Sequence, residues 1–149
     1  MYVKGRAFGS AAILLNRHAK SEHIKSDEIE YVVLYLLCQS IEVVLRGLLL
    51  FKDYDKYAKH LTRLGHNLSK IAAEALKAYG ENGTLKPMRT ALAGEIRTLS
   101  DLYSTHLLHY GTVSDMFVDP HSISHEKVVR RLAATIRLAE REFRRAQIT

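Results

Sequence analysis

The segment from Tyr31 to Phe51 limits the possible folds most, because it is apolar on almost every side of a helix. Polar and charged residues, among them Gln39, Glu42 and Arg46, interrupt the apolar run. Charged side chains are costly in lipid, so the pattern predicts a buried core helix rather than a membrane-spanning one. A helix without a polar face needs neighbours all round, and we therefore expect this one at the centre of a bundle.

The other segments also carry helical periodicity, and none alternates with the two-residue period of a strand. The connection between Lys52 and Gly65 is expected to be a loop that holds Tyr54 and Tyr57. The expected helices run from Arg6 to about Glu22, from Ser26 to Lys52, from Gly65 to Tyr79, from Pro87 to about Tyr110, and from Ser122 or Ser124 to about Ala146. The 149 residues thus predict one domain, 1–149, folded as an all-α bundle of four or five helices.

Composition narrows the classes of protein that remain. The single cysteine, Cys38, excludes an internal disulfide and any zinc site built on cysteines, and we interpret it as buried packing. No targeting segment is visible, so we expect a cytoplasmic protein that does not enter a membrane. Lys and Arg number 22 against 16 Asp and Glu, and the net charge of +6 favours a polyanionic partner.

Two motifs carry a family resemblance. The central helix contains Ser40-Ile41-Glu42, a short apolar run and Arg46, and the sequence Leu64-Gly65-His66-Asn67-Leu68 follows some distance later. This pairing resembles the HEPN-like helical domains, and His109-Tyr110-Gly111 is similar to the Arg-Tyr-Gly ending of some members, with His109 in place of the Arg. The resemblance implies an up-and-down helical bundle that forms a homodimer and binds RNA or a nucleotide.

Glu42 and His66 are the residues of these motifs whose chemistry is most informative. An unpaired carboxylate is costly to bury in an apolar helix, so Glu42 needs a partner, which His66, Arg46 or a helix N-terminus could supply. The two motifs occur together in the family pattern, and we expect Glu42 and His66 to meet or to share a hydrogen-bond network. We interpret the pair as a structural polar clamp that fixes the register of the helices, with a ligand-binding or catalytic role as the alternative.

The ribonuclease members of the family imply a second set of candidates, in which a His moves a proton and an Arg holds the phosphate. At the expected late position this sequence offers Arg97 with His106 or His109. Nine residue steps of ~100° place Arg97 and His106 on opposite faces of one helix, about 13 Å apart along its axis. That pair cannot hold one phosphate from a single straight helix, so the motif of the ribonuclease members is absent where it is expected. The resemblance implies that two protomers join their sites across a dimer cleft, where an Arg of the partner chain could act. The family's ribonuclease motif has an Arg and a His separated by four to six residues. Arg17 and His23 are separated by five residues and match that spacing, but they lie near the end of the first helix.

A metal site is the alternative role for the histidines. His106 and His109 share a helix face, and His121 and His125 lie near the start of the last helix. No third ligand has diagnostic spacing, so we interpret these histidines as ordinary surface or loop residues and expect neither a metal nor a cofactor.

Positive charge is concentrated in the last helix, where residues 126–149 carry +4 of the total +6. At ~100° per residue, six of the Lys and Arg residues of this helix fall within an arc of about 100°, opposite the apolar residues. We call these residues the basic stripe: Lys127, Arg130, Arg137, Arg141, Arg144 and Arg145. Such a stripe suits nucleic-acid phosphates, and a solvated or partner-facing surface is the alternative.

Three functions follow from these observations. The first is a HEPN-like nucleic-acid- or nucleotide-binding domain of toxin–antitoxin or defence type, without efficient catalysis and with an antitoxin-like protein as a further partner. The second is a metal-independent ribonuclease with an Arg/His site at a dimer cleft. The third is a non-catalytic helical protein-interaction domain whose charges serve only solvation.

Overall fold

The computed structural model describes residues 1–23, 26–79, 85–86, 88–91, 94, 96–104 and 125–148. These residues form an all-α bundle without strands, as the periodicity predicts. In chain order the helices are α1 (Tyr2–Ser21), α2 (Ser26–Lys52), α3 (Tyr54–Leu64), α4 (Leu68–Tyr79), α5 (Met88–Ala91), α6 (Arg97–Ser104) and α7 (His125–Ile148). There are more helical segments than the four or five that we expected, and several of them are short.

Helix α2 is the centre of the bundle, as its apolar surface predicts. It contacts α1, α3, α4, α6 and α7, and its side chains Leu37, Ile41 and Leu48 are almost completely buried. Within the described residues, Ile29–Lys52 is also the one helical segment long and apolar enough to cross a membrane, by length and composition alone. Of its most apolar 18-residue window, 67% is buried inside the molecule, which is the environment of a core helix.

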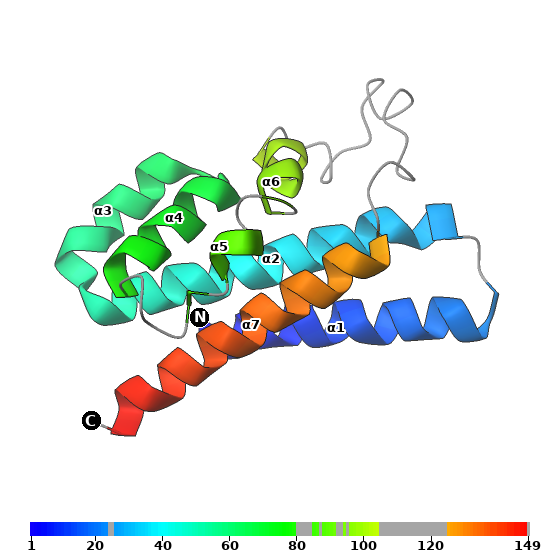
Figure 1. Cartoon of the computed structure of the whole chain (residues 1–149), viewed down its shortest axis with the longest axis horizontal. Coiled ribbons are helices and arrows are strands. Elements are labelled where there is room, and N and C mark those ends of the chain that lie inside the picture. The colour runs from blue at the N-terminus through cyan, green and yellow to red at the C-terminus, as the bar shows by residue number, and fades with distance from the viewer. Residues whose placement is uncertain are drawn as a thin grey trace.

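Helices α1 and α2 form an antiparallel hairpin whose close approach depends on small residues (Figure 1). A Cβ atom on Gly5 would lie 2.6 Å from Val44 Cγ2, and one on Gly9 would lie 2.9 Å from Ser40 Oγ. The Ser40 hydroxyl donates a 2.6 Å hydrogen bond to the Gly5 carbonyl oxygen. Helix α1 begins at Tyr2 rather than at Arg6, so Gly5 is helical and belongs to this contact.

Helix α3 occupies the stretch between Lys52 and Gly65, and the expectation of a loop there is wrong. The Asp53 side chain accepts a 3.0 Å hydrogen bond from the Lys56 backbone N–H and so caps the helix. Tyr57 and Leu61, one turn apart, are buried in the core. Tyr57 and Leu61 therefore form the buried apolar face of an amphipathic helix. Helices α3 and α4 lie together against the C-terminal half of α2.

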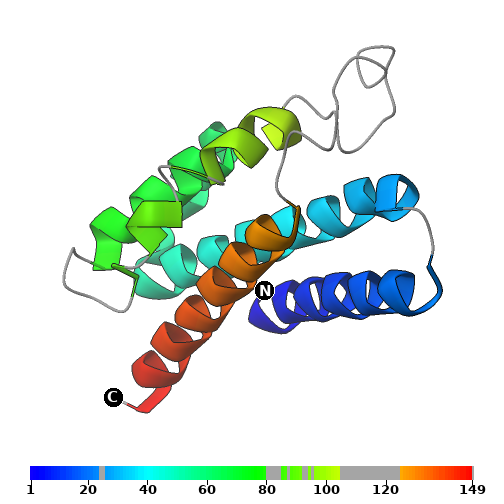
Figure 2. The ribbon, with the colours of Figure 1, turned by 45° about the vertical axis from the view of Figure 1, so that its right-hand side comes forward.

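The second half of the chain adds the described helices α5, α6 and α7 to this frame. Of the helix expected from Pro87 to about Tyr110, the structure describes α5 and α6, with residues 92, 93 and 95 between them outside the described part. Leu99 of α6 is buried in the core. Positions 105–124, which include the expected end near Tyr110, lie outside the described residues. Helix α7 crosses the α1–α2 hairpin obliquely, as the two views in Figure 1 and Figure 2 show. The bundle thus presents α1 and α7 on one side of α2 and the α3–α4 pair with α6 on another.

Candidate functional site

Glu42 is a buried carboxylate that three side chains reach. Its Oε1 accepts a 2.7 Å hydrogen bond from Arg46 Nε, one turn further along α2. Its Oε2 accepts a 2.7 Å hydrogen bond from the hydroxyl of Tyr103 on α6. Nδ1 of His66, in the turn between α3 and α4, lies 3.1 Å from Oε1 and 3.0 Å from Oε2. We call these four residues the Glu42 centre.

The structure brings Glu42 and His66 together, as their motifs led us to expect. An ionised carboxylate can only accept hydrogen bonds, so Nδ1 of His66 is the donor. The Glu42 side chain is 6% exposed, whereas the His66 side chain is 45% exposed. The imidazole therefore forms the outer side of the Glu42 centre, with Nε2 on the ring edge away from the carboxylate.

Arg46 holds the turn in which His66 lies. Besides bonding to Glu42, its guanidinium donates a 3.0 Å hydrogen bond to the Leu61 carbonyl oxygen and another to the Gly65 carbonyl oxygen. Gly65 has a φ of +53°, a conformation that favours glycine. One guanidinium thus bonds both to the carboxylate and to the carbonyl groups at the end of α3, which gives a physical reason for the Arg and the Gly-His pair to occur together.

Tyr103 connects α6 to the Glu42 centre, and no sequence motif pointed to it. Its side chain is fully buried, and its ring packs edge-on against the ring of His66 with centroids 5.8 Å apart. Burial, followed by the hydrogen bond to Glu42, raises the pKa of the Tyr103 hydroxyl well above its ordinary value. The hydroxyl therefore stays protonated and donates at neutral pH. It lies 61 positions from Glu42, so no local spacing pattern could identify it.

A second polar link holds the start of α4 against α6. Asn67 Oδ1 accepts hydrogen bonds from the Lys70 backbone N–H at 2.9 Å and from the Ser100 hydroxyl at 3.3 Å. The oxygen of Ser100 in turn accepts a 3.1 Å hydrogen bond from the Ser69 backbone N–H. Asn67 thereby caps α4, and the turn that carries His66 is fixed at both of its ends.

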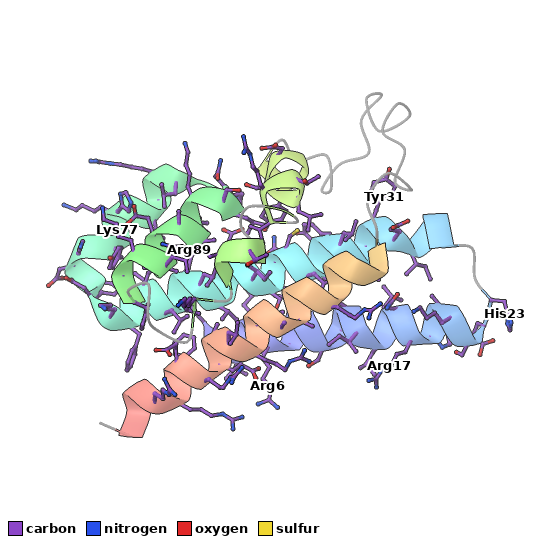
Figure 3. The ribbon with its side chains drawn as sticks, viewed as in Figure 1. Arg6, Arg17, His23, Tyr31, Lys77 and Arg89 are labelled. Carbon is purple, nitrogen blue, oxygen red and sulfur yellow. The ribbon has the colours of Figure 1, made fainter. Side chains whose placement is uncertain are left out.

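The candidate Arg/His pairs do not form a site within the residues that the structure describes. Arg97 is exposed on α6, one turn before Ser100, while His106 and His109 lie outside the described residues. Arg17 is exposed on α1 and His23 lies beyond the end of that helix, and Figure 3 shows that the two side chains do not point toward one another. The structure does not bring this pair together.

The remaining candidates for metal binding or nucleophilic chemistry give no site in the described residues. His121 and the side chain of His125 lie outside them. No group of three or more His, Cys, Asp or Glu side chains that could hold a metal occurs in the part of the chain that the structure describes. Cys38 is buried in the core, and burial raises the pKa of its thiol well above the ordinary value, so it remains an unreactive thiol.

The basic stripe follows the outer face of α7. Arg130, Arg137, Arg141, Arg144 and Arg145 are exposed, and the side chain of Lys127 lies outside the described residues. On the opposite face Ile136, Ala139 and Phe143 are buried. Arg145 lies 3.7 Å from Glu142. Arg137, Arg141 and Arg144 form no ion pair with any residue that the structure describes.

A hollow of about 110 Å³ lies between α1 and α7, at one edge of the basic stripe. It is lined by Arg6, Gly9, Ser10 and Ile13 from α1 and by Ala133, Ile136, Arg137 and Glu140 from α7. We call it the α1–α7 hollow. The sequence pattern did not connect Arg6 with the basic stripe, although Arg6, Ser10 and Ile13 have the spacing of one helix face. Only the crossing of α7 over α1 brings Arg6 to the edge of the basic stripe.

No protein-family model, curated protein or solved structure matches this chain.

Proposed function

We propose that this chain is a HEPN-like nucleic-acid-binding domain that holds the phosphate backbone on the basic stripe of α7. The observation that carries the proposal is that Arg137, Arg141 and Arg144 are exposed on one face and form no ion pair with the described residues. Arginine offers several N–H donors in a fixed plane, which suits phosphate oxygens. A stripe that acids from a neighbouring helix neutralised would instead favour a protein-interaction domain.

The HEPN-like part of the proposal is supported by the way the two motifs meet. Ser40 and Glu42, two positions apart, lie on different sides of α2, so Ser40 bonds to α1 while Glu42 bonds to the Gly-His turn. The polar residues of both motifs thus have defined contacts in this molecule. A homodimer and an antitoxin-like protein partner belong to the proposal because the resemblance implies them.

The experiment that tests the proposal measures binding of a fluorescent single-stranded RNA by anisotropy at several salt concentrations. Affinity is expected to fall steeply as salt rises, because bound cations release counterions from the phosphates. The double substitution Arg137→Glu with Arg141→Glu is expected to abolish binding. Its matched control is Lys59→Glu with Lys77→Glu, which makes the same change of net charge at exposed positions of α3 and α4.

The two double variants separate a local surface from a general attraction between opposite charges. Equal loss of affinity in both variants, or binding of the wild type that does not depend on salt, would remove the basic stripe as the binding surface. Thermal unfolding of each variant, followed by circular dichroism, establishes that the helices remain folded.

A metal-independent ribonuclease is the second candidate, and one contact in the Glu42 centre favours it. The buried carboxylate of Glu42 orients the imidazole of His66, and the His66 side chain is 45% exposed. A carboxylate that fixes a histidine in this way supports transfer of a proton at the outer ring nitrogen. His66 therefore joins His106 and His109 as a candidate acid–base group, with Arg97 or an arginine of the partner chain to hold the phosphate.

Cleavage of RNA in the presence of EDTA tests this second function. Substitution of the histidine that moves the proton, in the series His66→Ala, His106→Ala and His109→Ala, is expected to lower cleavage by ~10²–10⁴-fold. His60→Ala is the matched control, because His60 is also partly exposed and faces a carboxylate, that of Glu74, at 3.8 Å. Cleavage that survives all three substitutions would end the ribonuclease proposal.

A further inference from the structure

Two arginines and one glutamate are the charged residues that line the α1–α7 hollow. Arg6 enters it from α1, and Arg137 and Glu140 enter it from adjacent turns of α7. Nε of Arg6 lies 4.0 Å from Oε1 of Glu140, which is an ion pair too long to be a hydrogen bond. The donors of Arg6 are therefore drawn toward Glu140 without being satisfied by it.

The rest of the lining divides the hollow into a polar and an apolar part. Ser10 is the lining residue that carries a hydroxyl, while Ile13, Ala133 and Ile136 are the aliphatic ones. A phosphate group bonds well to two arginines and a hydroxyl, and the sugar attached to it can lie on an aliphatic wall. Free phosphate also offers anionic oxygens to the arginines, but it has no part that uses the apolar wall.

Glu140 opposes an anion in the same place. Its side chain is 19% exposed and lies among the lining residues, whereas Arg6 is 61% exposed and has room to turn. A phosphate that enters the α1–α7 hollow gains Arg6 and Arg137 but meets the negative charge of Glu140. Removal of that charge therefore favours an anion, even though Glu140 and Arg6 attract each other in the free protein.

From this geometry we infer that the α1–α7 hollow is a seat for one phosphodiester of a nucleic-acid strand, and that Glu140 limits its affinity. The inference rests on the proposed nucleic-acid-binding function and assigns to it a defined subsite. Arg6 and Arg137 hold the phosphate from two helices, and the strand continues along Arg141 and Arg144 of the basic stripe. Arg6 turns from Glu140 to the phosphate when the strand binds.

The test compares the affinity of the full chain and its variants for a single-stranded RNA, a single-stranded DNA of the same sequence, and inorganic phosphate as a competitor. Glu140→Gln is expected to tighten RNA binding about two- to fivefold, the size expected for a partly exposed charge pair. Arg6→Ala is expected to weaken the binding of RNA and the binding of DNA by equal factors, because the seat holds the phosphate backbone that both share. The same substitution is expected to lower the salt slope by ~0.7, because it removes one cation from the phosphates.

Glu142→Gln is the matched control for Glu140→Gln. It removes the same charge from the same helix, but Glu142 is paired with Arg145 and does not line the α1–α7 hollow. Equal tightening in Glu140→Gln and Glu142→Gln would show that only net charge matters, and would overturn the inference. Displacement of RNA by inorganic phosphate at an equal concentration of phosphate groups would assign the seat to free phosphate instead, and would also overturn it.

The same experiment separates failure of the seat from failure of the proposed function. RNA binding that is lost in the Arg137/Arg141 double variant but unchanged in Arg6→Ala and Glu140→Gln would leave the basic stripe as the binding surface and remove the seat. A wild-type protein that binds neither RNA nor DNA would remove both.

Discussion

The hydroxyl of Tyr103 donates a 2.7 Å hydrogen bond to Glu42, although 61 positions separate the two residues in the chain. The bond joins α6 to the central helix at the carboxylate that also bonds to Arg46 and His66. A carboxylate taken from water must recover its hydrogen bonds inside the protein, and Glu42 does so with groups from α2, from the α3–α4 turn and from α6. The same carboxylate therefore fixes the relative positions of three parts of the bundle.

Loss of the Glu42 carboxylate is expected to destabilise the fold. Glu42→Ala removes the acceptor of the buried Tyr103 hydroxyl and the carboxylate partner of Arg46, at a cost of ~1–3 kcal/mol in the free energy of unfolding. Urea unfolding followed by circular dichroism measures the change. Glu74→Ala is the control, since Glu74 is more exposed and its contact with His60 is 3.8 Å long. An unchanged unfolding midpoint in Glu42→Ala would contradict the role of the carboxylate as a clamp.

Close packing of α1 on α2 is expected to make Gly5 sensitive to a single methyl group. In Gly5→Ala the new Cβ would lie 2.6 Å from Val44 Cγ2, so one of the two helices must shift. Overpacking of this kind costs ~1–3 kcal/mol, and the better helix propensity of alanine recovers about 1 kcal/mol of it. Thermal unfolding is expected to show a lower Tm for Gly5→Ala but not for Gly94→Ala, where nothing lies within 4 Å of the new Cβ. Equal Tm values would mean that α1 can move away freely.

Alkaline pH is expected to weaken the fold through Tyr79. Burial, and then the nearby charge of Glu142, raise the pKa of the Tyr79 hydroxyl to about 12, and this hydroxyl donates a 2.9 Å hydrogen bond to the Leu48 carbonyl oxygen. The pKa in the unfolded chain is about 10, so the contribution of Tyr79 to stability is complete below pH ~10 and is lost as the pH rises toward 12. Urea unfolding at a series of pH values measures this loss.

Tyr79→Phe is the variant that isolates this titration from that of the lysines. It is expected to lose less stability than the wild type between pH 10 and 12, because it has no phenol to ionise. Tyr54→Phe is the control, because Tyr54 is exposed. Parallel curves for the wild type and Tyr79→Phe would show that other groups account for the alkaline unfolding.

Individual arginines of the basic stripe are expected to contribute separately to the salt dependence of RNA binding. Each phosphate contact with a single strand adds ~0.7 to the slope of log affinity against log salt concentration. Arg141→Ala and Arg144→Ala are each expected to lower the slope by about that amount, and Lys77→Ala on α4 is expected to leave it unchanged. A slope that no single substitution on α7 alters would place the bound strand elsewhere on the molecule.

The polar contact on which the candidate site depends could be predicted from the sequence only in part. Burial made a partner for Glu42 necessary, and the Gly-His motif indicated which residue supplies it. Arg46 could also be predicted as a partner, because it lies one turn away on the same helix. The contact of Tyr103 with Glu42 could not be predicted, because it depends on how α6 packs against the start of α4 through Asn67 and Ser100.

The sequence by itself determined that this chain is helical, that α2 is central and that one face of α7 is basic, because each of these properties is a periodic pattern along a single segment. The tertiary structure decided what lies across a contact between segments. It placed Tyr57 and Leu61 on a buried face, so that α3 is a helix rather than a loop, and it brought Arg6 beside Arg137 in the α1–α7 hollow. Periodicity fixes which side of a helix is apolar, whereas packing of many side chains selects the neighbour that covers it.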